Sequence, residues 1–77
     1  MSEQELLERI IINQKILEGK PIIKGTRLSV EFILNLLAHG STQEEIINEY
    51  KGLTIHDIQA CLLFATKSLG NAFFMPL

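Results

Sequence analysis

The residues with the most obvious chemical potential lie in one short stretch, GKPIIKGTRLSV, at positions 19–30. Two glycines and three cations in twelve residues suggest a phosphate-binding loop. Such a loop brings several glycine amides to a helix N-terminus and follows Gly-Lys with Ser or Thr. Here Gly19 and Lys20 are followed by Pro21, which has no amide proton to donate. The phosphate-loop pattern therefore fails, and we interpret the stretch as a tight hairpin.

The histidines, the cysteine and the acidic residues form no catalytic or metal-binding pattern. His39 and His56 lie far apart in the sequence, and neither has a second ligand at the i, i+4 spacing that builds a metal-binding helix face. Cys61 stands in an apolar run, where a thiol behaves as a small hydrophobic side chain. Asp57 and Glu44 fit the first turns of helices better than an acid–base pair. We expect no enzyme activity, no catalytic residue, no metal ion and no cofactor.

Length and composition predict one small cytoplasmic domain that associates with itself. The chain has 77 residues, a net charge of −2 and a single cysteine. A domain of this size removes only about 60% of its unfolded surface from water, and it has no disulfide to compensate. We therefore expect a homodimer. The N-terminus, MSEQELLERI, is acidic and precedes no long apolar run, which predicts neither a signal peptide nor a membrane contact.

The first thirty residues predict a short helix and a small β element. Leu6 and Leu7 fit about two helical turns with Ser2 as a cap. The β-branched run at 9–13, with apolar pairs at 22–23 and 28–30, predicts short strands. Structural roles in the turns and at the helix ends are expected for a set of small or rigid residues: Gly19, Pro21, Gly25, Thr26, Gly40 and Gly52.

Three helices are predicted after the β element. The first starts near Ser29 and ends at Gly40. Ser41 and Glu44 form a capping box that opens the second. Thr54 caps the third and longest helix, with Asp57 at the third helical position. Its apolar residues alternate in steps of three and four and are predicted to face the core: Ile55, Ile58, Leu62, Ala65 and Leu69.

The predicted fold is mainly α, in a single domain over residues 1–77. A short N-terminal helix and a β-hairpin element at 9–30 precede a three-helix, helix-turn-helix core at 30–69, and an apolar tail follows at 70–77. Phe32 and Leu36 widen the apolar surface of the first core helix, and Phe73 and Phe74 add apolar area in the tail. These four residues are the candidates for an oligomer interface.

A helix-turn-helix layout makes DNA binding one hypothesis. The exposed start of the last helix would meet base edges through Thr54, His56 and Gln59. This helix has no Lys or Arg before Lys67, so its phosphate contacts must come from elsewhere. The candidates are Lys51 and the cations of the hairpin region, Lys20, Lys24 and Arg27. A three-helix core with no DNA role fits the composition equally well.

Arg27 has a second interpretation, which we favour. Its rigid five-donor guanidinium suits a structural role at helix-end carbonyls or beside a carboxylate such as Glu31. Under this hypothesis Arg27 stabilises the hairpin, as Gly25 does.

The pattern GKP-x-I-x-GTR, followed by Leu28, Val30, Gly40, Tyr50 and the Leu53-Thr54 and Asp57-Ile58 pairs, resembles a prokaryotic domain-of-unknown-function family, number 433. The resemblance covers about residues 9–66. It implies a homeodomain-like helix-turn-helix fold, dimerisation and no catalysis. Some members resemble VapB-type antitoxins paired with a PIN-like nuclease toxin. The resemblance thus implies an antitoxin or transcriptional regulator that binds duplex DNA and a toxin protein. The alternative is a protein–protein interaction module without DNA binding.

Overall fold

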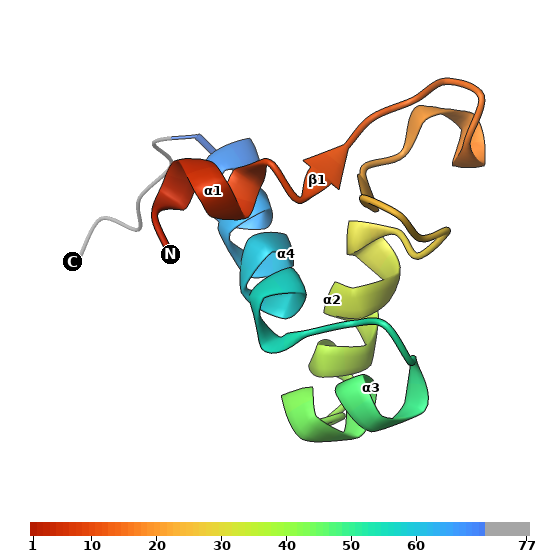
Figure 1. Ribbon diagram of the computed structural model, residues 1–77, viewed down its shortest axis with the longest axis vertical. Helices are drawn as coiled ribbons and strands as arrows, with labels where there is room; N and C mark the ends of the chain where they lie inside the picture. The colour runs from red at the N-terminus through yellow and green to blue at the C-terminus, as the bar shows by residue number, and fades with distance from the viewer. Residues whose placement is uncertain (71–77) are drawn as a thin grey trace, which may run out of the picture.

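Four helices and one two-stranded hairpin make up the part of the chain that the computed structural model describes, residues 1–70 (Figure 1). In chain order the elements are α1 (Glu3–Leu7), β1 (Ile10–Ile11), the 3₁₀ turn η1 (Leu17–Gly19), β2 (Ile22–Ile23), α2 (Val30–Ala38), α3 (Gln43–Glu49) and α4 (Ile55–Ser68). The mainly α fold with a short N-terminal helix and a small hairpin confirms the prediction. Phe73 and Phe74 lie outside the described residues.

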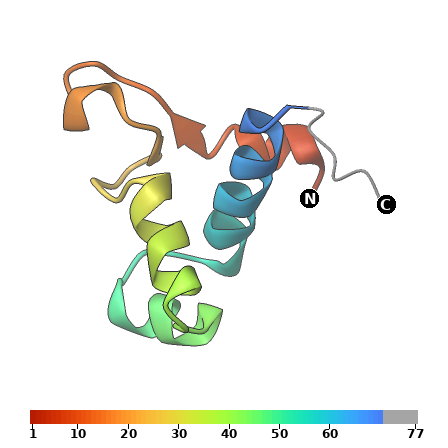
Figure 2. The same ribbon diagram turned by 180° about the vertical axis from the view of Figure 1, so that it is seen from behind.

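The last helix, α4, organises the fold. It contacts α1, α2, α3 and β1. Figures 1 and 2 show α2 and α4 side by side in the middle of the molecule, with α3 towards one end and the hairpin towards the other. The largest side chains that are under 2% exposed come from the hairpin and the last three helices: Ile22, Ile23, Ile33, Ile46, Ile58 and Cys61. The core therefore forms where these elements meet.

The hairpin is shorter than predicted. β1 pairs antiparallel with β2, with Ile10 opposite Ile23 and Ile11 opposite Ile22. The third extended piece contributes only a single bridge, between Ile22 and Ser29. Ser29 already caps α2, because its side chain accepts a hydrogen bond from the Phe32 amide (3.0 Å). The chain therefore becomes helical before a third strand can extend.

The turn after β2 explains the GTR sequence. Gly25 has a φ of +83°, a conformation that glycine adopts without steric cost. The Thr26 hydroxyl donates to the Ile23 carbonyl (2.7 Å) and accepts from the Leu28 amide (3.0 Å). These contacts close a tight turn between Ile23 and Leu28, but the hairpin predicted over GKPIIKGTRLSV is reduced to the single bridge between Ile22 and Ser29.

The capping box of α3 is displaced by one residue from its predicted place. The Thr42 hydroxyl accepts from the Glu45 amide (3.1 Å), and the Glu45 carboxylate accepts from the Thr42 amide (2.8 Å). The hydrogen bond from the Thr42 amide lowers the pKa of Glu45 below its usual value, and a hydrogen bond with the Thr42 side chain makes a smaller contribution. The prediction of Ser41 and Glu44 is wrong because the Ser41 amide bonds back to the Leu36 carbonyl (3.0 Å) and so still belongs to the end of α2.

The apolar repeat of α4 is only partly buried, which corrects a second prediction. Ile58 is fully buried, whereas Ile55, Leu62 and Leu69 are 36%, 41% and 73% exposed. Ala60 is buried instead, since α1 packs along α4. A second face of α4, the one that α1 packs against, is thus covered, whereas the predicted stripe lies only partly in the core.

Candidate functional site

The three predicted base-contacting residues lie together at the start of α4. Thr54 and Gln59 are exposed, and His56 is half-buried. The Thr54 side chain caps α4 by accepting from the Asp57 amide (3.4 Å). His56 Nδ1 lies 3.2 Å from Gln59 Oε1, so these two side chains hydrogen-bond each other on the helix surface. The donors left for another molecule are the Gln59 amide nitrogen and the free edge of the His56 ring.

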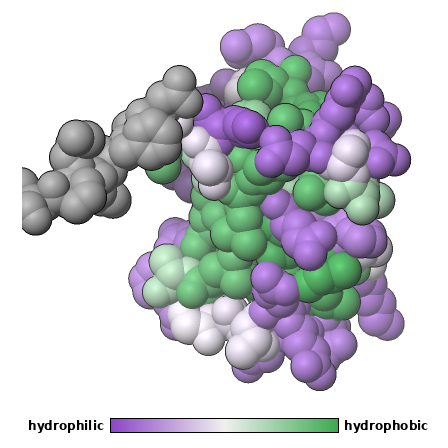
Figure 3. Space-filling view, turned by 90° about the vertical axis from the view of Figure 1, so that its left-hand side faces the viewer, coloured by the Kyte–Doolittle hydropathy of each residue, from purple (hydrophilic) through white to green (hydrophobic). Residues whose placement is uncertain are grey.

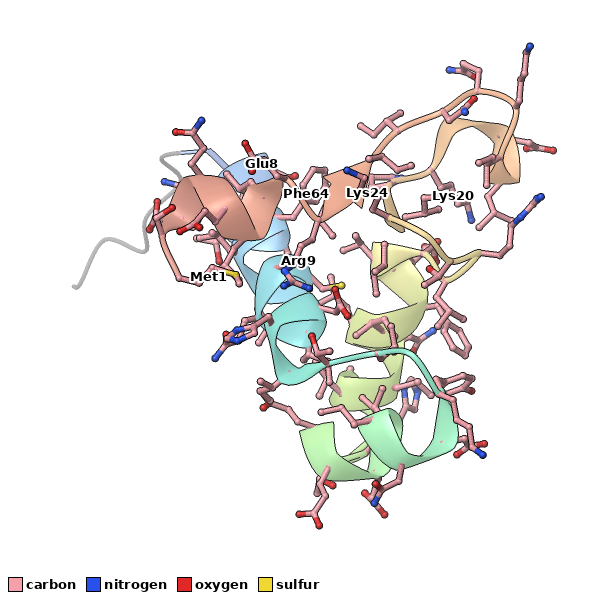
Figure 4. The ribbon with its side chains drawn as sticks, viewed as in Figure 1. Met1, Glu8, Arg9, Lys20, Lys24 and Phe64 are labelled. Atoms are coloured by element: carbon pink, nitrogen blue, oxygen red, sulfur yellow. The ribbon has the colours of Figure 1, made fainter. Side chains whose placement is uncertain are left out.

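An ion pair that the sequence does not reveal lies beside this group. Arg9 Nη1 donates to Asp57 Oδ1 at 2.9 Å, and Asp57 is only 6% exposed. The Thr54 amide (2.9 Å) and the Thr54 hydroxyl (3.2 Å) donate to the other carboxylate oxygen. Figure 4 shows Arg9 reaching from the segment after α1 towards α4. The Asp57 charge is therefore neutralised and buried, rather than presented to a phosphate.

The predicted phosphate-contacting cations do not form one patch. Lys20 Nζ pairs with Glu31 Oε1 at 3.0 Å, and both side chains are exposed. Lys24 lines a polar hollow of about 360 Å³, with Arg9 and Asp57 and with two acidic residues of the α1 segment (Figure 4). Lys51 is exposed in the turn after α3. This mixture of charges does not resemble the continuous basic stripe that a strong DNA-binding surface presents.

Arg27 has no structural role within residues 1–70. Its side chain is exposed and makes no hydrogen bond or ion pair with a described residue. Glu31, the partner expected for it, is held by Lys20 instead. The prediction of a structural Arg27 is therefore wrong, and the guanidinium is free for an external ligand.

We expect Gly25→Val to lower the free energy of unfolding by about 1–2 kcal/mol, because a β-branched residue is strained at positive φ. Arg27→Ala should change it by less than about 0.5 kcal/mol, because an exposed side chain without a partner contributes little. Urea unfolding of both variants beside the wild type measures the difference. Equal destabilisation by the two substitutions would contradict the assigned contacts.

An open apolar groove of about 630 Å³ lies between α2 and the C-terminal half of α4. Val30 and Leu34 line it from α2, and Phe64 and Leu69 line it from α4. Among the described residues that line it, Glu31 is the only charged one. The sequence analysis missed this groove, because helical periodicity shows that a face is apolar but not whether a neighbouring helix closes over it.

The predicted interface residues of α2 lie outside this groove. Leu36 packs against the hydrophobic core of its own chain. Phe32 is 37% exposed and meets the Tyr50 ring edge to face, with 5.6 Å between centroids and an interplanar angle of 88°. Phe32 keeps some free surface, whereas Leu36 is largely used by its own fold.

No described residue offers obvious catalytic or metal-binding chemistry. Burial, and after it the charge of Asp57, raise the pKa of Cys61 to about 12, so this side chain is a neutral thiol at physiological pH. Residues 1–70 contain no group of three His, Cys, Asp or Glu side chains placed to hold a metal ion. None of the described helices has the length and apolar character needed to cross a membrane.

Comparisons with known proteins place this fold in a family. No curated protein matches the chain. The crystal structure of a DUF433 member protein from Anabaena variabilis is similar, with a TM-score of 0.78 and 26% sequence identity over 86% of this chain. The matched region spans 65% of the length of that protein. A family model described as "Protein of unknown function (DUF433)" matches residues 10–65. The chain therefore belongs to the DUF433 family.

Proposed function

We propose that this protein works by binding, as an antitoxin that neutralises a PIN-like nuclease toxin through direct contact. The observation that carries the proposal is the apolar groove between α2 and α4. A groove between two helices receives the apolar face of a third helix, with side chains spaced at i, i+3 or i+4 and i+7. The expected occupant is therefore an amphipathic helix of the toxin.

Two features of the chain support a binding role over catalysis. Two reactive side chains within residues 1–70 are used structurally: Asp57 in an ion pair and a helix cap, and Cys61 in the core. The resemblance to VapB-type antitoxins within the family points to the same class of function.

The test uses co-expression with a PIN-like nuclease, taken from the neighbouring gene if that gene encodes one. The wild-type chain should restore growth and suppress RNA cleavage by the purified nuclease. Ala38→Lys adds a charge to the groove from an exposed position, and it should abolish both effects. Asn48→Lys adds the same charge on α3, outside the groove, and should leave both effects intact. Full protection by the Ala38→Lys variant, or no protection by the wild type, would refute the proposal.

A second candidate function is transcriptional regulation through duplex DNA. It is supported by the exposed Thr54 and Gln59 and the half-buried His56 at the start of α4, directly after a helix and a turn. Asp57, whose charge would repel a phosphate, is buried and paired with Arg9. Of the cations predicted to contact phosphates, Lys24, Arg27 and Lys51 make no ion pair within residues 1–70.

A salt titration of the purified protein on its own promoter fragment tests this second function. Each phosphate contact should add about −0.9 to the slope of log affinity against log salt. Lys24→Ala and Lys51→Ala should weaken binding to all sequences and flatten the slope, whereas Gln59→Ala should mainly relax sequence preference. If no retardation occurs even at low salt, the function is protein–protein interaction without DNA binding.

A further inference from the structure

The outward face of α4, continued by its C-cap residue Leu69, carries a regular stripe that the fold of residues 1–70 leaves exposed. Ile55, Leu62 and Leu69 follow one another at intervals of seven residues and are 36%, 41% and 73% exposed. Gln59 and Thr66 lie between them and are also exposed. The spacing along the stripe is four, three, four, three, which is the spacing of a coiled-coil seam. At 1.5 Å per residue the stripe is about 21 Å long.

Figure 3 shows hydrophobic residues gathered in a continuous band across the side of the molecule on which α4 lies. Exposed apolar side chains that are scattered singly are normal, but a repeat along one helix is not. The stripe also has a different location from the groove of the proposed function. Of its five residues only Leu69 lines that groove.

The charges of α4 point away from the stripe. Apart from its histidine, α4 has two charged residues, Asp57 and Lys67. Asp57 pairs with Arg9, and Lys67 Nζ pairs with Glu3 Oε1 at 3.2 Å. Both partners belong to the N-terminal segment that packs along another side of α4. The stripe itself is therefore free of charge.

The polar members of the stripe already have hydrogen-bond partners within α4. The Thr66 hydroxyl donates to the Leu62 carbonyl at 2.9 Å. The Gln59 side-chain oxygen lies 3.2 Å from His56 Nδ1. The Gln59 amide nitrogen has no partner among residues 1–70, so covering this face costs the hydration of that one donor group but spares the Thr66 hydroxyl and the Gln59 oxygen.

We propose that the stripe of Ile55, Gln59, Leu62, Thr66 and Leu69 is a homodimer interface, in which α4 packs against α4 of a second copy about a two-fold axis near Leu62. A stripe with this spacing fits a copy of itself, because both helices offer the same side chains and holes. A second copy also brings no charge to the seam, although each chain carries a net charge of −2. A nucleic acid is excluded as the occupant, because the stripe offers no cation to its phosphates.

The dimer goes beyond the proposed antitoxin function, and it limits how the protein could bind DNA in the second candidate function. A four-turn seam is smaller than a standard interface, so the dimer should be weak, with a Kd of about 1–10 μM. Gln59 would be covered in the dimer and would not reach a base edge. Dimerisation through α4 and base recognition by Gln59 therefore exclude each other.

The first test is the mass of the full chain by light scattering across a concentration series. The wild type should approach twice its 8.7 kDa chain mass as concentration rises. Leu62→Glu should raise the Kd of the dimer about 100-fold or more, because it places two carboxylates at the two-fold axis. Ile12→Glu introduces the same charge at a more exposed apolar residue (61%) outside α4, and this variant should dimerise as the wild type does. Far-UV circular dichroism establishes that both variants are folded.

Two results would overturn the proposal: a wild type that stays at the mass of one chain throughout, or a Leu62→Glu variant that dimerises normally. The second result would assign the dimer to another surface.

Cross-linking gives an independent readout. Leu62→Cys should form a covalent dimer under oxidised glutathione, whereas the wild type should not, because Cys61 is fully buried. Failure of Leu62→Cys to cross-link at concentrations where the mass is doubled would also refute the α4 seam. Neither test involves the nuclease, so the dimer and the antitoxin proposal succeed or fail separately.

Discussion

Replacing Asp57 by alanine is expected to lower the free energy of unfolding by about 2–3 kcal/mol, one of the largest effects of any single substitution in this protein. Removing one partner of a fully buried ion pair costs about 3–5 kcal/mol, and the lower value here allows for the 32% exposure of the Arg9 side chain. The variant also loses the acceptor for the Thr54 amide at the start of α4. For a domain of this size the loss corresponds to a fall in Tm of about 10–20 °C.

Two further variants separate the ion pair from the helix cap. Asp57→Asn keeps an oxygen that can accept from the Thr54 amide but has no charge, so it should cost less than alanine. Arg9→Met removes the cation and leaves the Asp57 carboxylate buried without its partner. A double-mutant cycle between Arg9→Met and Asp57→Ala should give a coupling energy of about 1–2 kcal/mol. Additive effects in that cycle would mean that the 2.9 Å contact contributes nothing to stability.

Replacing Ile58 by alanine should be at least as costly, at about 3–4 kcal/mol. Ile58 is fully buried in the cluster formed by β2 and helices α2, α3 and α4, so the substitution leaves a cavity that the neighbours cannot fill completely. Ile55 on the same helix provides a matched control with the same chemical change. Because Ile55 is 36% exposed, Ile55→Ala should cost less than about 1 kcal/mol in the monomer.

Urea unfolding at protein concentrations below the dimer Kd measures both isoleucine variants. Equal m-values are expected, since neither substitution should change the surface exposed on unfolding. If Ile55→Ala were as destabilising as Ile58→Ala, the two residues would share one core-facing stripe, as the repeat in the sequence alone suggests.

The features that the sequence predicted correctly are those determined by residues close together in the chain. The capping box of Thr54 and Asp57 and the turn at Gly25 and Thr26 depend on neighbours within three residues, so their residue types were sufficient. Ser41 and Thr42 both suit a helix cap, so their residue types alone do not show which of them opens α3. The decision between them depends on where α2 ends, through the bond from the Ser41 amide to the Leu36 carbonyl.

The features that the sequence could not predict depend on contacts between distant segments. Arg9 and Asp57 are 48 positions apart, and no local pattern marks them as partners. The apolar repeat of α4 correctly predicted a helix, but it could not tell which face the rest of the chain would cover. The position of α1 along α4 decided that Ala60 is buried and Leu62 is exposed.

The central position of α4 has a consequence for how the protein is made. Each of the other helices contacts α4, which is the last described helix to leave the ribosome. Residues 1–54 therefore cannot complete the core until α4 has been synthesised. Synthesis of α4 alone takes about 1–3 s at the usual rates of translation. During this interval Ile22, Ile23 and Ile33 remain without their final neighbours and are available to chaperones. Folding is thus expected to be a single late event that follows synthesis of α4, rather than a gradual assembly from the N-terminus.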